Sequence, residues 1–272
     1  MRQPFKKPFG KKLFGKYDRP PPKKPGPAND TERKLVFNPE NDLIYGAHPV
    51  AAALQNENRK IIKLWATENG EARLREEVGD LKIEAEIVHP RLLDHMLKSK
   101  DAVHQGMILE AKPLRQPRLD DIPRQGLVVV LDQVTDPHNV GAIMRSCVAF
   151  GATAIVTTAR NAAETNGAFL KAASGAYEWI PYVTVTNLAR AIEELKSYGF
   201  TTLGLDSEAA QNIDGLKLSR PLALVLGAEG KGLRQLTRET CDVVARLDMP
   251  GKIKSLNVSI AAAVSLYALR PK

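Results

Sequence analysis

From residue 126 onward the chain alternates short apolar runs with stretches of helical periodicity. Continuous runs of Val, Ile and Leu are typical of strands that are covered on both faces. We therefore predict a mainly parallel α/β sheet with helices over 139–150, 188–198 and 255–270. The predicted strands are GLVVVLD (126–132), ATAIVTT (152–158), WIPYVTV (179–185), FTTLGLD (200–206), PLALVLG (221–227) and VVARLDM (243–249).

Residues 42–113 show a similar alternation and are predicted to form a small separate α/β domain. An extended segment at 42–46 is followed by a helix, a strand, two helices and a closing strand at 106–113. The stretch LRQPRLDDIPRQ at 114–125 has two prolines, mixed charge and no apolar period, which is typical of a linker. The larger domain is then expected to occupy residues 126–272.

Residues 1–41 have neither a helical nor a strand period and are predicted to be disordered. Seven prolines precede Ala28, among lysines and spaced aromatic residues. Residues 1–36 hold 11 of the 39 basic residues but only 3 of the 31 acidic ones, so the net charge of +8 belongs to this tail and the rest is formally neutral. Such a tail is either an arm that follows RNA phosphates and stacks on bases, or a solubilising segment.

Composition and residue spacing exclude several classes of protein. The longest apolar stretches, such as 127–131 and 260–264, are far shorter than the roughly 20 residues that cross a bilayer. Because the proline-rich N-terminus also lacks the apolar core of a secretory signal, we expect a cytoplasmic protein with no membrane contact. Cys147 and Cys241 lie in apolar surroundings and are predicted to be free thiols. The five histidines show no ligand spacing, so no metal is expected.

Two loops that follow predicted strands carry polar residues where parallel sheets bind their ligands. In LDQVTDPHNVGAIMRS (131–146) the chain turns at Asp136, and Asn139 opens a helix that carries Arg145. In LALVLGAEGKGL (222–233) Glu229 stands among three glycines, which allow a backbone to approach a ligand closely. The glycine spacing matches neither a nucleoside-triphosphate loop nor a dinucleotide fingerprint. Each loop taken alone also has an ordinary interpretation as a helix cap or a strand-to-helix turn.

A third loop, within LDMPGKIKSLNVSIAAAVSLYAL (247–269), joins a strand to an alanine-rich helix. A Pro-Gly turn precedes Ser255 and Asn257, and either residue is a good helix N-cap. Three consecutive alanines at 261–263 allow another segment to pack closely against this helix. We expect another segment to press against it.

Together, and in this order, the three loops resemble the motifs of the SpoU or TrmH branch of the SPOUT methyltransferases. IYGAHPVAAAL (44–54) and HQGMILEAKP (104–113) resemble the opening and the close of the small substrate-binding domain that precedes the catalytic domain in bacterial ribosomal-RNA members. The resemblance covers residues 42–272. It implies methyl transfer from S-adenosylmethionine to a ribose 2′-hydroxyl of RNA, with a guanosine in 23S rRNA or a large-subunit precursor as the nearest likeness.

The resemblance also implies site residues, a trefoil knot in the catalytic domain, and a homodimer with the donor pocket at the subunit interface. Because a guanidinium is too basic to accept a proton, we expect Arg145 to clamp a phosphate and to stabilise the developing alkoxide. The implied catalytic residues are Asn139, Arg145, Glu229, Ser255 and Asn257, and the implied donor-binding residues are Gly227, Leu247 and Leu256.

Three alternatives to this function stay open at the level of sequence. An enzyme of the same branch would methylate transfer RNA or a different ribosomal nucleotide, although the small domain favours ribosomal RNA. A catalytically silent RNA-binding factor in ribosome assembly would need only the tail and the small domain. A small-molecule-binding α/β protein would need neither. The set of five polar residues favours an enzyme, since a pure binder has no evident need for them.

Overall fold

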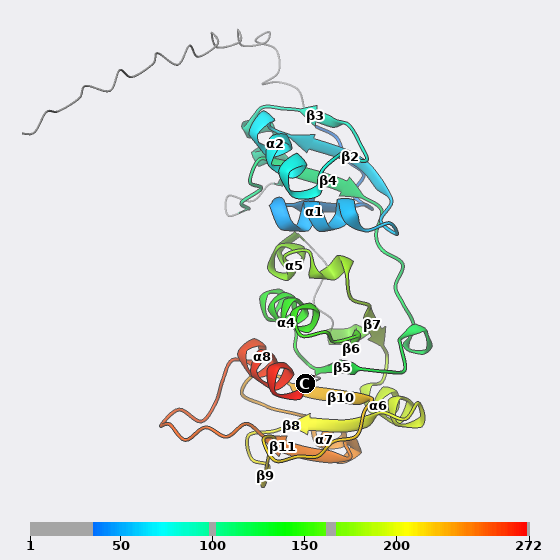
Figure 1. Ribbon diagram of the computed structural model, residues 1–272, viewed down its shortest axis with the longest axis vertical. Coiled ribbons are helices and arrows are strands. Elements are labelled where there is room, and N and C mark those ends of the chain that lie inside the picture. Colours follow the sequence, from blue (N-terminus) through cyan, green and yellow to red (C-terminus); the bar gives the residue numbers. More distant parts are fainter. Residues whose placement is uncertain (1–34, 98–101, 162–166, 271–272) are drawn as a thin grey trace, which may run out of the picture. The chain divides into compact units, whose positions relative to one another are not determined.

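A computed structural model of the chain describes residues 35–97, 102–161 and 167–270, which build two β-sheets (Figure 1). The predicted disordered tail lies outside the described residues up to residue 34. Both sheets belong to α/β arrangements, as the apolar pattern predicts. Within the described part of the chain, no helix has the length and apolar character needed to cross a membrane.

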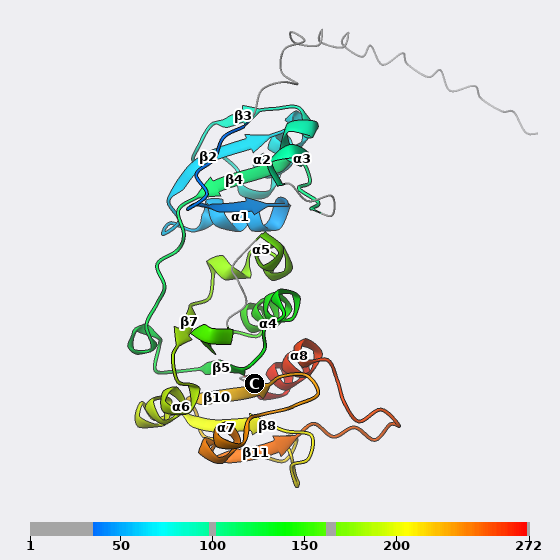
Figure 2. The same ribbon diagram turned by 180° about the vertical axis from the view of Figure 1, so that it is seen from behind.

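The smaller sheet has four strands in the order β1-β4-β2-β3. Helices α1 and α2 share a core with one face of this sheet, while α3 packs with Trp65 and Ile108 on the other face, which Figure 2 brings into view. The pattern did not predict β3, because its three residues, none of them buried, are too few to show a strand period. The elements are β1 (Asp42–Tyr45), α1 (Ala47–Gln55), β2 (Ile61–Ala66), α2 (Glu68–Val78), β3 (Ala85–Ile87), α3 (Pro90–Leu97) and β4 (Met107–Ala111).

The larger sheet has seven strands in the order β7-β6-β5-β10-β8-β11-β9, and every pairing in it is parallel. All six predicted strands are present. Three short elements, α5, α7 and β9, were not predicted. The strands are β5 (Leu127–Asp132), β6 (Ala154–Thr158), β7 (Tyr182–Val185), β8 (Thr201–Leu205), β9 (Gln211–Asn212), β10 (Leu222–Gly227) and β11 (Val243–Arg246). The helices are α4 (Pro137–Ala149), α5 (Gly167–Ala173), α6 (Leu188–Ser197), α7 (Gln235–Thr240) and α8 (Val258–Leu269), with short 3₁₀ turns η1 (Leu119–Asp121), η2 (Ala159–Asn161) and η3 (Ala176–Glu178).

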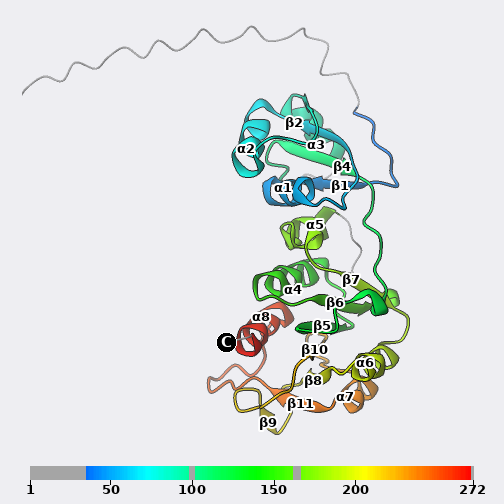
Figure 3. The same ribbon diagram turned by 45° about the vertical axis from the view of Figure 1, so that its right-hand side comes forward.

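Helices cover both faces of the larger sheet, which explains the continuous apolar runs. One face of β5 carries residues 127, 129 and 131, which share a core with Ile143 of α4. The other face carries residues 128 and 130, which share a second core with Ile192 of α6. Figure 3 shows α4 and α8 on one side of the strands and α6 and α7 on the other. Because neighbouring side chains of a strand point to opposite faces, a strand covered twice needs apolar residues throughout.

Polar caps fix where the two helices of interest begin. The Asp136 side chain accepts a hydrogen bond of 3.0 Å from His138 N, so α4 begins at Pro137. The Asn257 side chain accepts one of 2.9 Å from Ser259 N, so α8 begins at Val258. The predicted start of this helix at residue 255 is wrong by three residues, because the side chain that caps the free N–H groups is Asn257 rather than Ser255.

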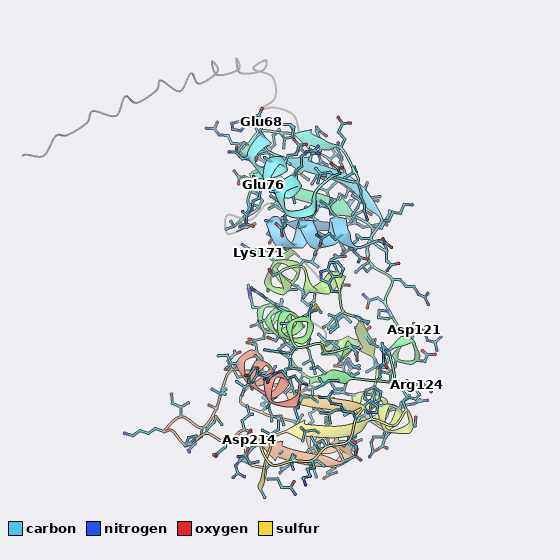
Figure 4. The ribbon with its side chains drawn as sticks, viewed as in Figure 1. Glu68, Glu76, Asp121, Arg124, Lys171 and Asp214 are labelled. Atoms are coloured by element: carbon cyan, nitrogen blue, oxygen red, sulfur yellow. The ribbon has the colours of Figure 1, made fainter. Side chains whose placement is uncertain are left out.

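The predicted linker is packed against the larger domain rather than running free. It contains the turn η1, and Leu119 and Ile122 are buried in the core that α6 also lines. The guanidinium of Arg124 lies 4.1 Å from the centroid of the Tyr198 ring, and Figure 4 places Asp121 and Arg124 on this side of the domain. The connection between the two domains is therefore held in place by apolar burial.

A buried arginine ties the small domain to the large one. The Arg59 side chain is fully buried, with Nη2 2.6 Å from Oε1 of Glu178 and Nη1 2.7 Å from Oδ2 of Asp42. The carbonyl of Lys112 accepts a further hydrogen bond from Nη1 at 2.8 Å. Burial by itself lowers the pKa of Arg59, but the hydrogen bonds and charges of Glu178 and Asp42 outweigh it and raise the pKa. The guanidinium therefore stays charged inside the interface.

We expect both cysteine thiols to stay protonated and slow to react. They are free, as predicted, and burial raises the pKa of the Cys147 thiol well above its usual range. Burial, reinforced by the charge of Asp242, raises the pKa of Cys241 to about 12. Because the thiolate is the reactive form, iodoacetamide at about pH 8 should label neither cysteine in the folded protein and both in strong denaturant. Rapid labelling of the folded protein would contradict this expectation.

Candidate active site

Several loops meet at the carboxyl edge of the larger sheet. β5 and β10 are adjacent parallel strands that end side by side, with Asp132 in register with Gly227. β8 flanks β10 on its other side. The segment 247–257 leaves β11 at the same edge, runs beyond it and returns to α8 (Figure 1). The three loops that the sequence singled out are therefore neighbours in space.

A pocket opens at this edge and collects most of the predicted residues. It is lined by all three residues that were expected to hold the methyl donor, Gly227, Leu247 and Leu256. Glu229 and Ser255 line it as well, whereas Asn139, Arg145 and Asn257 do not. The pocket thus joins the second and third loops, while the first loop stands beside it on α4.

The loop after β8 also lines the pocket and was missed by sequence reasoning. Leu205 ends the strand, and Asp206 and Ser207 follow it directly. The signal was present in the sequence, because polar residues immediately after a buried strand are the same feature that marked the other loops. Because parallel strands end at the same edge of a sheet, the loop after each of them is expected to contribute to a ligand site there.

Glycines fold the second loop back on itself. Gly232 N donates a hydrogen bond of 2.9 Å to the carbonyl of Ala228. A Cβ on Gly227 would lie 2.1 Å from the carbonyl carbon of Gly232, so a side chain there is excluded by the backbone. Gly230 and Gly232 adopt φ angles of 77° and 64°, which favour glycine. This tight turn holds Glu229 exposed at the rim of the pocket.

Asn257 contacts two of the other predicted catalytic residues, Asn139 and Glu229, so three of the five form one network. Its Nδ2 donates to Oδ1 of Asn139 at 3.1 Å and to Oε2 of Glu229 at 3.2 Å. Its Oδ1 accepts from the backbone N and from Oγ of Ser259, at 2.9 and 2.6 Å. Both hydrogens of the amide are then in use, and the backbone N–H of Ser259 fixes which end is the oxygen. Asn139 consequently accepts through its own oxygen and presents its NH₂ group for a ligand.

Ser259 was not singled out in the sequence, and we expect it to orient Asn257. Ser259→Ala removes the Oγ donor but keeps the backbone N–H, so the methyl transfer that the resemblance implies should slow by about three- to tenfold, in line with the loss of one hydrogen bond. Single-turnover rates at saturating donor measure this effect. Ser265→Ala, a buried serine on the same helix, is the matched control and should keep the wild-type rate. Equal rates for the two variants would remove Ser259 from the site.

Arg145 and Ser255 are not joined to this network. Arg145 lies on α4 beyond Asn139 with an exposed side chain, and within the described residues it has no hydrogen-bond or ion-pair partner. The Glu229 carboxylate accepts from Asn257 and makes no ion pair with Arg145. Ser255 lies exposed in the pocket wall. Both side chains are therefore available to a bound molecule.

Exposed lysines stand on the loops around the pocket, whose lining also holds the acidic Asp206 and Glu229, and the described residues include no metal centre. Lys231 in the glycine loop and Lys252 and Lys254 in the segment before α8 are all exposed. No three His, Cys, Asp or Glu side chains of the described part gather as a metal-binding group. Exposed lysines on these loops suit a polyanion such as an RNA backbone.

Two family models match this chain. Residues 126–267 match the model of the SpoU rRNA Methylase family, which spans more than half of the chain. The chain belongs to the SpoU rRNA methylase family. Residues 43–117 match a second model, described as RNA 2′-O ribose methyltransferase substrate binding. The resemblance that the three loops and the two small-domain segments indicated is therefore confirmed.

Curated relatives in this family cover most of the chain. The chain is 39% identical over 237 residues to the 23S rRNA (guanosine-2′-O-)-methyltransferase RlmB of Photobacterium profundum, covering 84% of this chain and 96% of the relative. It is 40% identical over 237 residues to RlmB of Vibrio parahaemolyticus, covering 84% and 95%. The Bacillus subtilis protein named putative TrmH family tRNA/rRNA methyltransferase YacO is 36% identical over 244 residues, covering 86% and 96%.

Solved structures of the family share the fold. The SpoU methyltransferase AviRb from Streptomyces viridochromogenes, solved in complex with the cofactor AdoMet, matches with a TM-score of 0.71 and 25% identity over 84% of this chain and 89% of that one. A TrmH-family protein from Porphyromonas gingivalis matches with a TM-score of 0.69 and 23% identity over 85% and 90%. The SpoU-type α/β fold, with a small domain before the methylase domain, is thereby established for this chain, and the family's cofactor is S-adenosylmethionine.

Proposed function

We propose that this SpoU-family protein transfers a methyl group from S-adenosylmethionine to the ribose 2′-hydroxyl of a guanosine in 23S ribosomal RNA. The observation that carries the proposal is the Asn139–Asn257–Glu229 network, which reaches through Glu229 the pocket lined by the expected donor-binding residues. The name that the relatives share supports the guanosine of 23S RNA as the target. A ribosomal substrate also supports the proposal that the reaction takes place in the cytoplasm.

The pocket lining fits S-adenosylmethionine chemically. Leu205, Leu247 and Leu256 give apolar walls that would enclose the adenine. The backbone of the glycine loop and the Ser207 hydroxyl would serve the ribose and the amino-acid end, and the Glu229 carboxylate favours a positively charged ligand. When bound, the donor supplies an electrophilic methyl group on its sulfonium.

The residues outside the donor pocket would act on the RNA. Arg145 would clamp the phosphate next to the target ribose and stabilise charge that develops on the 2′-oxygen, since its guanidinium has no partner among the described residues. The NH₂ group of Asn139, whose oxygen is held by Asn257, would donate to the same nucleotide. Ser255, at the pocket wall, would help to fix the ribose. Holding the acceptor oxygen in line with the methyl group contributes several kcal/mol by itself.

The protein is further proposed to act as a homodimer with the pocket close to the interface. α8 is apolar on both sides, because Ala262 and Leu266 are buried in the core whereas Ile260, Val264 and Tyr267 are 45 to 56% exposed. These three exposed residues share one face of the helix, at spacings of four and three. A helix that is apolar all round is normally covered on all sides, and a second copy of this chain would cover the free face.

We expect the chain to sediment as a dimer at micromolar concentration. Val264→Glu places a charge on the exposed face of α8 without touching its buried face, so it should yield monomers that keep the native circular dichroism. The matched control is Thr184→Glu, which places the same charge on an exposed residue of β7 and should leave the dimer intact. A wild-type chain that sediments as a monomer at every concentration would defeat the dimer proposal.

We also propose that the catalytic domain forms a trefoil knot and that the small domain binds RNA. β10 lies between β5 and β8, so the chain returns to the middle of the sheet late in the sequence, which is compatible with the trefoil knot of the family. The small domain at 42–113 would hold the RNA substrate, supported by the match to a substrate-binding model. The basic tail as an additional RNA-binding arm stays a prediction, since it lies outside the described residues.

The deciding experiment is methyl transfer from labelled S-adenosylmethionine to ribosomal and transfer RNA, followed by mapping of the modified ribose. A single 2′-O-methylated guanosine in 23S RNA is expected with the wild type and none with Asn139→Ala. Methylation of transfer RNA or of another ribosomal nucleotide would replace the substrate within the same reaction. Binding of RNA without transfer would favour the silent assembly factor instead.

A further inference from the structure

A buried carboxylate stands directly behind the glycine loop. Asp132 is fully buried at the end of β5, and its side chain does not line the pocket. Its Oδ1 accepts a hydrogen bond of 2.7 Å from Nε of Arg234, and its Oδ2 accepts one of 3.0 Å from the backbone N of the same residue. The two residues are 102 positions apart in the sequence.

Both ends of the glycine loop lie at this one residue, the first beside its backbone and the second on its carboxylate. Gly227, where the loop begins, is the register partner of Asp132 in the pairing of β10 with β5. Arg234, where the loop ends, is the N-cap residue of α7. The loop 227–234 therefore leaves the sheet beside Asp132 and returns to its carboxylate. Glu229 and the glycines that line the pocket lie between these two anchor points.

We propose that Asp132 is a positioning residue for the methyl-donor pocket, acting through Arg234 on the loop that holds Glu229. This inference rests on the proposed function, because it assigns the pocket to S-adenosylmethionine. The carboxylate touches no ligand itself. Its effect is to hold the loop in its donor-binding shape before the donor arrives.

The physical argument combines the cost of burying a charge with the freedom of a glycine loop. A buried carboxylate is strongly unfavourable unless charged or hydrogen-bonded partners satisfy it, and Arg234 supplies both kinds of contact. Glycine has more backbone freedom to lose than any other residue, so the loop with its three glycines would otherwise sample many shapes. Pinning its two ends at one point removes most of that freedom. Affinity for a ligand rises when such ordering is complete before binding.

The test is donor binding to the full-length protein with Asp132→Asn, measured by titration calorimetry with S-adenosylmethionine. The amide keeps the size and one acceptor, but it loses the charge that pairs with the guanidinium. We expect the Kd for the donor to rise by about tenfold or more, as for a lost charged hydrogen bond.

Asp242→Asn is the matched control. Its carboxylate makes the same kind of clamp, accepting from N and Oγ of Thr202 at 2.9 Å each and pairing with Lys196 at 3.2 Å, but at the amino-terminal end of β8, away from the pocket. This variant should lose thermal stability and keep the wild-type donor Kd. Arg234→Ala, whose side chain is half-exposed, should weaken donor binding like Asp132→Asn. In the double variant the two losses should not multiply, because they remove one interaction.

Each outcome decides the matter. The inference is overturned if Asp132→Asn and Arg234→Ala both keep the wild-type donor affinity and only lower the melting temperature, as Asp242→Asn does. The ion pair would then be purely structural. If Asp132→Asn does not fold, the half-exposed Arg234→Ala variant gives the answer. A wild-type protein that does not bind S-adenosylmethionine would reject the proposed function itself, and that failure is recognised before any variant is made.

Discussion

Replacing Arg145 with lysine is expected to slow methyl transfer by about a hundredfold or more, as the loss of a preorganised charged donor does in other enzymes. The guanidinium is a planar fork that can hold a phosphate oxygen and the developing 2′-oxygenate together, whereas an ammonium is a point charge. Donor affinity should not change, because Arg145 does not line the pocket. The loss should therefore fall on kcat with saturating donor, and not on the donor Kd.

The measurement is single-turnover methylation of the RNA together with calorimetric donor binding. Arg190→Lys is the matched control, since Arg190 is also an exposed helical arginine but lies on α6, across the sheet from α4. It should transfer methyl groups at the wild-type rate. Near-normal turnover with Arg145→Lys would discard the bidentate clamp and leave positive charge alone as the requirement. A weakened donor Kd would instead place the arginine in the donor pocket.

Replacing Arg59 with alanine is expected to lower the free energy of unfolding by about 3 to 5 kcal/mol, the usual cost of breaking a buried ion pair from one side. The change leaves the buried carboxylate of Glu178, 2% exposed, and that of Asp42 without their cation. It also removes the hydrogen bond to Lys112. The small domain should lose its hold on the larger one, so RNA affinity should fall along with stability. Urea denaturation gives the first effect, and filter binding of ribosomal RNA gives the second.

Two further variants separate the effect of breaking the buried ion cluster from the general effect of losing an arginine. Arg75→Ala removes an exposed i,i+4 pair with Glu71 at 2.7 Å, and it should cost no more than about 0.5 kcal/mol. Removing Glu178 together with Arg59 should cost less than the sum of the two single changes, because the second change also removes a stranded charge. If Arg59→Ala is no more harmful than Arg75→Ala, the interface does not depend on the ion cluster.

Much of the larger domain could be predicted because its elements carry periodic apolar signals. The run at 127–131 indicates a strand covered on both faces, and β5 is such a strand. Three of the elements that were missed, β3, α7 and β9, are too short to carry this signal. β3 has no buried residue, α7 has six residues, and β9 pairs through only two. Such short elements are fixed by what they pack against, and a periodicity argument needs more length than they offer.

The sequence by itself determined three of the four loops that meet at the pocket edge, since polar residues and glycines that directly follow buried strands can be found without coordinates. Only the tertiary structure decided which of these residues meet. Asn257 contacts Asn139 across 118 positions, and Asp132 contacts Arg234 across 102, because β10 enters the sheet beside β5 and α8 packs against α4. Periodicity reports whether each face of a segment is buried, over a few residues at a time. Strand order and helix packing set the long-range contacts, and they depend on the free energy of the whole core rather than on any local pattern.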